Sequence, residues 1–149
     1  AAYAVIQILL PLRLHMYEGN TNWTNDGHQF AWRMLLRMKV PHTPQFRYVC
    51  VRDGETKTGV IGLVPPPARV TDHWQLNKML IIPDMILQFV HLQAEQMRQA
   101  GCDEVQIYAT VPVSLNGRPP QLMVDPNVDL VKEPRRWFKP YPWVTELKE

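Results

Sequence analysis

The chain contains 149 residues, the length of one domain that can bury a core without metal ions or disulfides. Hydrophobic residues make up 46% and charged residues 20%, which excludes an intrinsically disordered chain. The formal net charge is only +2, so we expect no nucleic-acid partner. Proline is frequent (14 residues) and glycine scarce (7 residues), which favours short strands and rigid loops over a helical bundle.

The first twelve residues, AAYAVIQILLPL, are almost entirely apolar. This segment is shorter than the ~18–20 apolar residues that span a bilayer. It also lacks the basic start and the small-residue cleavage site of a signal peptide. The residues alone leave two interpretations open: a short amphipathic or buried helix, or the end of a longer membrane helix that is broken at Pro11.

Three segments in the first half predict an antiparallel meander. Residues 30–39 alternate apolar and basic side chains, which favours a half-buried strand over the helix that their Met and Leu residues would also permit. Residues 45–53 are rich in aromatic and β-branched side chains. Asp53-Gly54 is a strong turn signal, so residues 57–64 are expected to return as a third strand.

The clearest element is a helix at residues 83–100. Pro83 and Asp84 suit the first turn of a helix, and Gly101 is a typical residue after its last turn. The preceding connector, residues 68–82, is expected to pack against the core. The side chains predicted to pack are Trp74, Leu76 and Met79 in the connector, and Ile86, Phe89, Val90, Gln93 and Met97 on the helix.

A second antiparallel hairpin follows the helix. Residues 104–115 alternate apolar and polar side chains over their whole length, which predicts one long strand. Asn116-Gly117 is the strongest two-residue hairpin signal, and residues 118–124 are expected to form the returning strand.

The end of the chain is rich in proline and tryptophan. A short strand is expected at residues 128–131, followed by a tail that Trp137 and Trp143 anchor to the surface. The predicted fold class is therefore α+β, with antiparallel hairpins packed on one main α-helix and a proline-rich C-terminal tail.

The two cysteines, Cys50 and Cys102, do not form a C-x-x-C motif, which excludes a zinc ribbon and a disulfide-dense scaffold. One bridge can form if the two residues meet in the fold. We expect two separate thiols, because Cys50 belongs to a predicted strand and Cys102 to the turn after the helix.

No complete catalytic or metal-binding motif occurs in the sequence. The five histidines lack metal-ligand spacing, and neither phosphate-binding glycine loop is present. Asp125 and Asp129, four residues apart, could bind calcium or act as an acid and a base. We favour the structural interpretation, in which Asp125 caps a turn and Asp129 faces solvent. We therefore predict no catalytic residue and no metal ligand in this chain.

Four segments in this order resemble the vitamin K-dependent γ-glutamyl carboxylase family, in particular its bacterial-type members, also called HTTM-domain proteins. The resemblance extends from about residue 9 to residue 144. The segments are LLPLRLHMYEGNTNWTNDGHQFAWRMLLRMK, PDMILQFVHLQAEQM, VPVSLNGRPPQLMVDPNVDLVKE and the terminal PWV.

This resemblance implies an integral membrane protein with an extracytoplasmic (periplasmic or lumenal) α+β portion. The animal enzyme of the family oxidises reduced vitamin K with O₂ and uses this reaction to add CO₂ to a substrate glutamate. The catalytic base lies in the membrane domain, so the cofactor sites are expected outside this chain, and we expect the isolated chain to be inactive. Residues 1–16 would be the end of a membrane-proximal helix and residues 17–149 the extracytoplasmic domain.

The resemblance also implies a substrate-binding loop. The segment from Asn20 through Asn22, Trp23 and Thr24 is similar to the family segment near the glutamate, and Trp32 is similar to an aromatic residue just beyond it. Animal enzymes have a tyrosine where Asn20 stands. The competing interpretation is structural, with Trp23 closing a sheet edge and the asparagines closing turns.

The functional hypothesis is that this chain positions a glutamyl substrate, as part of a glutamate-containing peptide, over an active site in the membrane domain of the same protein. The alternative is a non-catalytic binding or assembly module of a diverged HTTM membrane protein.

Overall fold

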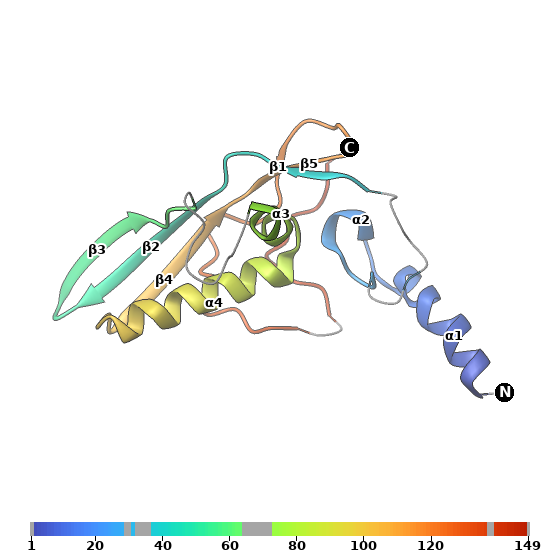
Figure 1. Ribbon diagram of the computed structural model, residues 1–149, viewed down its shortest axis with the longest axis horizontal. Coiled ribbons are helices and arrows are strands. Elements are labelled where there is room, and N and C mark those ends of the chain that lie inside the picture. The colour runs from blue at the N-terminus through green and yellow to red at the C-terminus, as the bar shows by residue number, and fades with distance from the viewer. Residues whose placement is uncertain (1, 29–30, 32–36, 64–72, 137–138, 149) are drawn as a thin grey trace.

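The computed structural model of the chain describes residues 2–28, 31, 37–63, 73–136 and 139–148. Helices and two small antiparallel sheets make up the fold, which confirms the predicted α+β class (Figure 1). In chain order the elements are α1 (Ala2–Leu12), the 3₁₀ helix η1 (Arg13–Met16), α2 (Thr21–Thr24), β1 (Lys39–Pro41), β2 (Gln45–Arg52), β3 (Glu55–Val60), α3 (His73–Ile81), α4 (Pro83–Gln99), β4 (Glu104–Thr110), β5 (Pro112–Leu115) and β6 (Gln121–Leu122).

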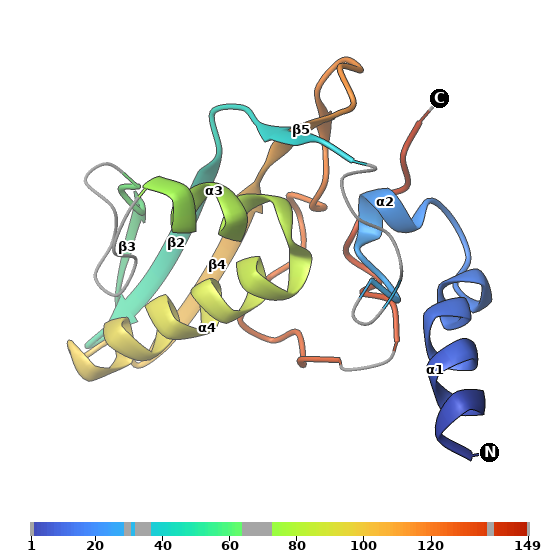
Figure 2. The same cartoon turned by 45° about the vertical axis from the view of Figure 1, so that its right-hand side comes forward.

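The larger sheet has the strand order β3-β2-β4, and α3 and α4 cover one of its faces (Figure 2). The β2–β3 hairpin turns at Asp53-Gly54 as predicted, and both residues adopt positive φ. On the covered face, Phe46 of β2 pairs with Ala109 of β4, and both are fully buried. The ring of Phe89 from α4 meets the ring of Phe46 edge-on, with centroids 5.1 Å apart.

The smaller sheet has the order β1-β5-β6, so the predicted meander is wrong in its first pairing. Lys39–Pro41 pairs with β5 instead of with β2, and the rest of the predicted strand at residues 30–39 lies largely outside the described residues. The chain leaves this sheet through a turn in which Thr43 has φ +35°. The presence of Pro41 and Pro44 beside the turn favours this break, because proline cannot extend a strand ladder.

The predicted long strand at residues 104–115 is likewise divided between the two sheets. It forms β4 up to Thr110 and then β5 from Pro112, while its alternating side chains stay buried on one side. Pro112 lacks an N–H donor, which suits the position where the chain changes partners. The hairpin at Asn116-Gly117 is confirmed, but the returning strand is only β6, Gln121–Leu122.

The predicted strand at residues 128–131 is a turn. Asp129 is only 11% exposed, and its Oδ1 accepts hydrogen bonds from the backbone N–H groups of Ile107 (3.1 Å) and Val131 (3.2 Å). The expectation that Asp129 faces solvent is therefore wrong. Asp125 caps its turn as predicted, since its Oδ1 accepts from the Asn127 N–H at 2.9 Å.

The predicted helix is confirmed as α4, and the predicted connector contains a second helix, α3. Leu76 and Met79 of α3 are buried as expected, but Trp74 is 68% exposed, which corrects its predicted role in packing. In α4, Pro83 stands at the first turn and Gly101 follows the helix with φ +98°.

The C-terminal segment completes the core beside the smaller sheet. Val124 forms an isolated bridge with Val144, and Trp143, the residue before Val144, is 1% exposed. Trp143 is therefore an anchor, as predicted, whereas Trp137 lies outside the described residues. The Tyr141 and Trp143 rings are in contact, with centroids 4.9 Å apart.

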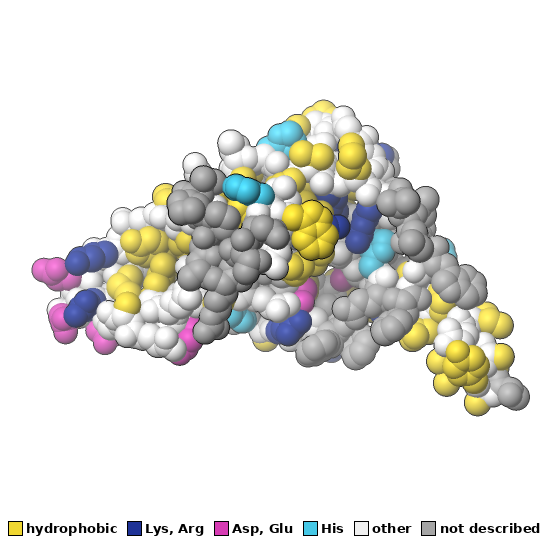
Figure 3. Space-filling view, in the orientation of Figure 1, with side chains coloured by type: hydrophobic (Ala, Val, Ile, Leu, Met, Phe, Trp, Pro, Cys, Tyr) yellow, Lys and Arg dark blue, Asp and Glu magenta, His cyan; other side chains and the backbone are white. Residues whose placement is uncertain are grey.

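Helix α1 extends away from this core, and its apolar side chains are exposed (Figures 1 and 3). Tyr3 and Leu9, for example, are largely accessible on the helix surface, whereas Pro11 near its end is buried. Among the described residues, no helix has both the length and the apolar character needed to cross a bilayer.

Cys50 and Cys102 form a disulfide, which corrects the expectation of separate thiols. The register explains the contact, because Cys50 of β2 pairs with Val105, three residues after Cys102. The Asp103 N–H also donates to the Val51 carbonyl at 2.8 Å, which holds the end of the helix connection against β2. The bridge closes a loop across a sequence separation of 52 residues.

Replacing both cysteines, Cys50→Ser with Cys102→Ser, should lower the free energy of unfolding by about 2–5 kcal/mol, because the unfolded chain loses a long cross-link. Urea denaturation monitored by circular dichroism measures this loss. Reduction of the parent protein should reproduce the loss and leave the double variant unchanged. Equal stability of the oxidised parent and the double variant would contradict the prediction.

Candidate functional site

The loop that resembles the family's substrate segment is built around the short helix α2. Asn20 caps this helix, and its Oδ1 accepts from the Asn22 N–H at 3.0 Å. Asn25 ends the helix in the left-handed region with φ 72°, and its N–H donates to the Thr21 carbonyl. The asparagines therefore shape the turn, as the structural interpretation expects.

Trp23 is 1% exposed, and its indole Nε1 donates to the Thr145 carbonyl at 2.7 Å. Its ring belongs to the core, where it fixes the loop against the C-terminal segment. Thr24, the next residue, lines a cavity, and its Oγ1 accepts from the Asp26 N–H at 3.3 Å. Trp32, the remaining residue predicted to bind substrate, lies outside the described residues.

Lys39, which the sequence did not single out, holds this loop to the helical layer. Its ammonium group donates to the Trp23 carbonyl, to the Ile81 carbonyl at 3.1 Å and to Asn25 Oδ1 at 3.1 Å. Its Nζ also lies 5.7 Å from the centroid of the Trp23 ring. A single side chain from β1 thus ties α2 to the junction between α3 and α4.

The environment of Lys39 disfavours its positive charge. Burial and the nearby Arg37 charge lower the pKa of Lys39 to about 7, and the Asp26 carboxylate opposes this shift. The Arg37 Nη1 donates to Asn25 Oδ1 at 2.6 Å, and burial lowers the pKa of this guanidinium as well. The Arg37 guanidinium and the Lys39 ammonium group therefore both donate to the Asn25 amide oxygen.

A cavity of about 320 Å³ opens between this loop, η1, the start of α4 and the C-terminal segment. It is the meeting point of four parts of the chain that are far apart in sequence. The described residues that line it are Arg13, Tyr17, Thr24, Asn25, Asp26, Gly27, His28, Ile82, Asp84, Met85, Arg135, Arg136, Lys139 and Tyr141.

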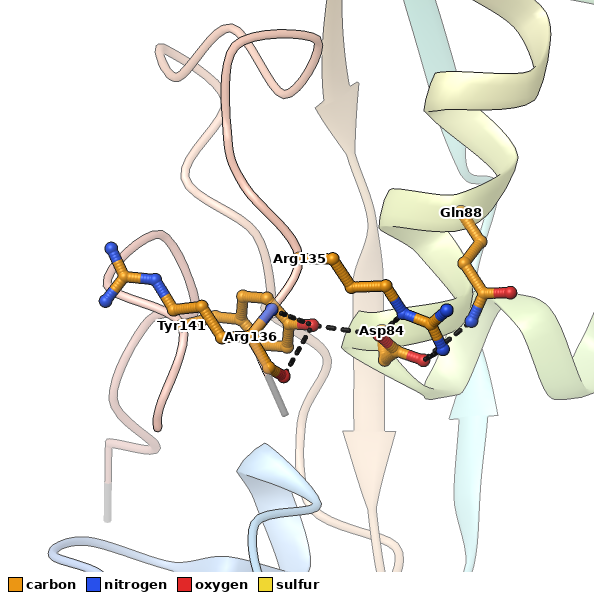
Figure 4. Close-up of polar contacts among 5 residues, drawn as sticks. All are labelled: Asp84, Gln88, Arg135, Arg136 and Tyr141. Atoms are coloured by element: carbon orange, nitrogen blue, oxygen red, sulfur yellow. Dashed lines mark hydrogen bonds and ion pairs between the residues drawn. The ribbon is translucent and has the colours of Figure 1, made fainter. Parts of the chain in front are cut away.

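Asp84 organises one wall of the cavity (Figure 4). Arg135 donates to both carboxylate oxygens, from Nε at 2.8 Å and from Nη2 at 2.9 Å. The Tyr141 hydroxyl donates to Oδ1 at 2.9 Å, and the Gln88 amide donates to Oδ2 at 2.6 Å. The Tyr141 oxygen also accepts from the Arg136 N–H at 3.2 Å, so the network reaches the C-terminal segment.

These contacts keep Asp84 ionised. Burial acts to raise the pKa of Asp84, but the hydrogen bonds from Arg135 and Tyr141 outweigh it and lower the pKa. Burial also raises the pKa of the Tyr141 hydroxyl, and the Asp84 charge adds to that effect. At neutral pH the carboxylate and the Arg135 guanidinium therefore neutralise each other.

Arg136 and Lys139 add further positive charge to the cavity, because the Asp84 carboxylate is already paired with Arg135. The Arg136 side chain points away from Asp84 (Figure 4), and neither residue forms an ion pair with an acidic group in the described part of the chain. A cavity with this lining can bind an anion such as a carboxylate. Within the described ranges, no three metal-ligating side chains converge.

The comparison with protein families gives a match over residues 1–149 to the family described as vitamin K-dependent gamma-carboxylase, lumenal domain. The chain belongs to this family. No solved structure gives a significant match. The family name describes the domain as lumenal, which implies the extracytoplasmic side of a membrane protein.

In this lumenal domain, the sequence singled out the loop around α2, of which Thr24 lines the cavity, but it did not indicate the cavity itself. Asp84 was noticed only as a first-turn residue, and Arg135, Arg136 and Lys139 were assigned to a surface tail. Three basic residues within five positions, next to a tyrosine, are the signal that could have indicated an anion site. Their convergence with Asp84 depends on the path of the C-terminal segment.

Substituting Lys39→Met should change how stability depends on pH. The folded pKa of about 7 lies below the unfolded value of about 10.4, so the unfolded state binds the extra proton between them. The parent protein should therefore gain stability as pH rises from 7 to 10, by up to about 1.4 kcal/mol per pH unit from this group.

Denaturation at several pH values measures this slope, which Lys39→Met should remove. Lys57→Met, on the exposed strand β3, is the matched control and should keep the parent slope. A parent slope that survives in Lys39→Met would contradict the prediction.

Asp84→Asn should destabilise the protein by about 1 kcal/mol at neutral pH, because a partly exposed ion pair and its charged hydrogen bonds are lost. The folded pKa of Asp84 is lowered, so its contribution is present above pH ~4 and disappears as pH falls through the folded pKa. The difference between parent and variant should therefore shrink towards pH 3. Asp53→Asn, at an exposed turn residue, should show no such pH-dependent difference.

Proposed function

We propose that this chain is the extracytoplasmic domain of a carboxylase-like membrane protein and binds a glutamyl side chain of a peptide in the cavity described above. The supporting observation is the charge of the cavity. The described lining has four basic side chains, Arg13, Arg135, Arg136 and Lys139, against the two carboxylates of Asp26 and Asp84, so a net positive charge remains to attract an incoming carboxylate.

Most of the loop residues contribute to this site by holding the loop in its conformation. Thr24 lines the cavity itself and can donate its hydroxyl proton to a ligand. Asn20 and Asn22 hold the turn, and Trp23 anchors it in the core. Trp32 retains the substrate-binding role that the family resemblance implies.

Residues 1–16 are proposed to be the membrane-proximal end of a helix, and residues 17–149 the extracytoplasmic domain. The exposed apolar side chains of α1 suit a lipid or protein environment. Arg13, directly after α1, lines the cavity. The glutamyl site would then face the membrane domain of the same protein, where the reaction takes place.

The charged and polar lining of the cavity does not suit an apolar quinol. We therefore assign reduced vitamin K, O₂ and CO₂ to the membrane-embedded part of the protein, and to this chain the binding and orientation of the peptide. Proteins of the HTTM type that have lost the chemistry would retain the domain as an assembly module.

The combined substitution Arg136→Gln and Lys139→Gln should weaken binding of a glutamate-containing peptide by about tenfold or more. The measurement is fluorescence anisotropy with the full-length protein in nanodiscs. A peptide with glutamine in place of glutamate should bind weakly and equally to the parent and to the variant.

Lys57→Gln removes a lysine far from the cavity and is the charge control for this experiment. If the double variant binds the glutamate peptide as the parent does, the assembly-module hypothesis is favoured instead. Trp23→Ala is unsuitable as a test, because removing a buried tryptophan costs about 3–5 kcal/mol of stability.

A further inference from the structure

Lys39 fastens the loop of residues 20–28 to the helical layer. Its ammonium group has three N–H donors, and three oxygen acceptors surround it: the Trp23 carbonyl, the Ile81 carbonyl at 3.1 Å and Asn25 Oδ1 at 3.1 Å. Two of these acceptors belong to the loop, and the third belongs to the last residue of α3. The loop can therefore move away from the helices only when these hydrogen bonds break.

The same loop forms part of the wall of the cavity. Five consecutive loop residues line it: Thr24, Asn25, Asp26, Gly27 and His28. Movement of the loop away from the helices would therefore open the cavity, and it would also bring the Lys39 ammonium group into water.

In the closed loop, the surroundings of Lys39 are unfavourable for a cation. The Arg37 guanidinium donates to the same Asn25 oxygen at 2.6 Å, so two positive side chains converge on one neutral acceptor. Among the described residues, the charges that act on Lys39 are Arg37 from its own segment and Asp26 from the loop. A single carboxylate thus opposes the repulsion between the two cations.

The other elements packed around Lys39 offer it neutral groups. The end of α3 presents a carbonyl, and the segment after β6 presents the Met123 sulfur at 4.0 Å. The ionisable side chains of α3 and of the first turn of α4 have other positions or partners. His73 begins α3 at the end opposite Ile81, Lys78 lies over the Trp74 ring, and Asp84 pairs with Arg135.

We propose that Lys39 is a proton-operated latch on the cavity: its neutral form keeps the loop closed, and uptake of a proton favours the open loop. The neutral amine keeps two N–H donors for the surrounding oxygens, and Arg37 does not repel it. The ammonium ion is stabilised by water, which it reaches when the loop moves away. This inference concerns the motion of the loop and does not depend on which ligand the cavity binds.

The direction of the pH dependence follows from linkage. The pKa of Lys39 is about 7 in the closed loop, because burial and the Arg37 charge lower it, and about 10.4 when the side chain is in water. The open state therefore binds more protons than the closed state between these two values. Closure should become more favourable as the pH rises above 7, and it should be independent of pH well below 7.

Hydrogen–deuterium exchange of the full-length protein in nanodiscs, measured by mass spectrometry, reports the opening of the loop. In the closed loop, the N–H groups of Trp23 and Thr24 donate to the Asn20 carbonyl, and that of Asn25 donates to the Thr21 carbonyl. A helix as short as α2 is unstable in water once it is detached, so these groups exchange when the loop opens. After correction for the intrinsic exchange rate at each pH, their protection should rise about tenfold from pH 6 to pH 8.

Variants assign this rise to Lys39. Lys39→Met removes the charge and Lys39→Arg keeps it at every pH tested, so protection in either variant should not depend on pH. Arg37→Gln removes the repelling charge and should move the onset of the rise to higher pH, whereas Asp26→Asn should move it to lower pH. His28 is retained in all four variants, so a pH effect caused by this histidine would persist in them. Lys57→Met, on β3, is the control and should keep the tenfold rise.

Equal protection of the parent loop at pH 6 and pH 8 would overturn the inference, as would a rise that persists in both Lys39 variants. Shifts of the onset in the same direction for Arg37→Gln and Asp26→Asn would also overturn it, because the two charges act on Lys39 in opposite directions. These two shifts test the inference even where a Lys39 variant does not fold. Circular dichroism of each variant checks that the fold is retained.

Discussion

The burial of one face of α4 against β2 and β4 is the constraint on which the rest of the structure depends. Ile86 and Val90 of the helix and Ile107 of β4 have no exposed surface, and the Phe46–Phe89 contact joins the two layers. Each buried aliphatic side chain of this kind contributes roughly 1.5–3 kcal/mol. Because the helix cannot rotate without exposing this face, its first turn has a defined position. The position of this first turn in turn fixes Asp84 and the wall of the cavity that Asp84 organises.

Polar contacts then attach the remaining segments to this rigid layer. Lys39 connects the loop around α2 to the end of α3, and Asp84 connects α4 to the C-terminal segment through Arg135 and Tyr141. Lys39 is largely buried and Asp84 partly so, and both compensate their loss of hydration with several hydrogen bonds. The cavity between them is therefore shaped by groups that the protein must hold in place for its own stability.

The position of the site also gives the family assignment a physical meaning. The chain belongs to the family of carboxylase lumenal domains, and the apolar helix α1 leads directly into Arg13 at the cavity. Peptide binding and membrane chemistry would thus be performed by different parts of one protein.

The sequence by itself determined the elements whose signals are local. The period of apolar residues and the flanking Pro83 and Gly101 identified α4, the Asp-Gly and Asn-Gly pairs identified both hairpin turns, and strict alternation identified the buried face from Val105 to Val113. The tertiary structure alone decided which strands pair, that Cys50 meets Cys102, and that Arg136 and Lys139 converge on the loop at Thr24. These features depend on register between distant segments, and register is set by how the whole core packs, which no local pattern encodes.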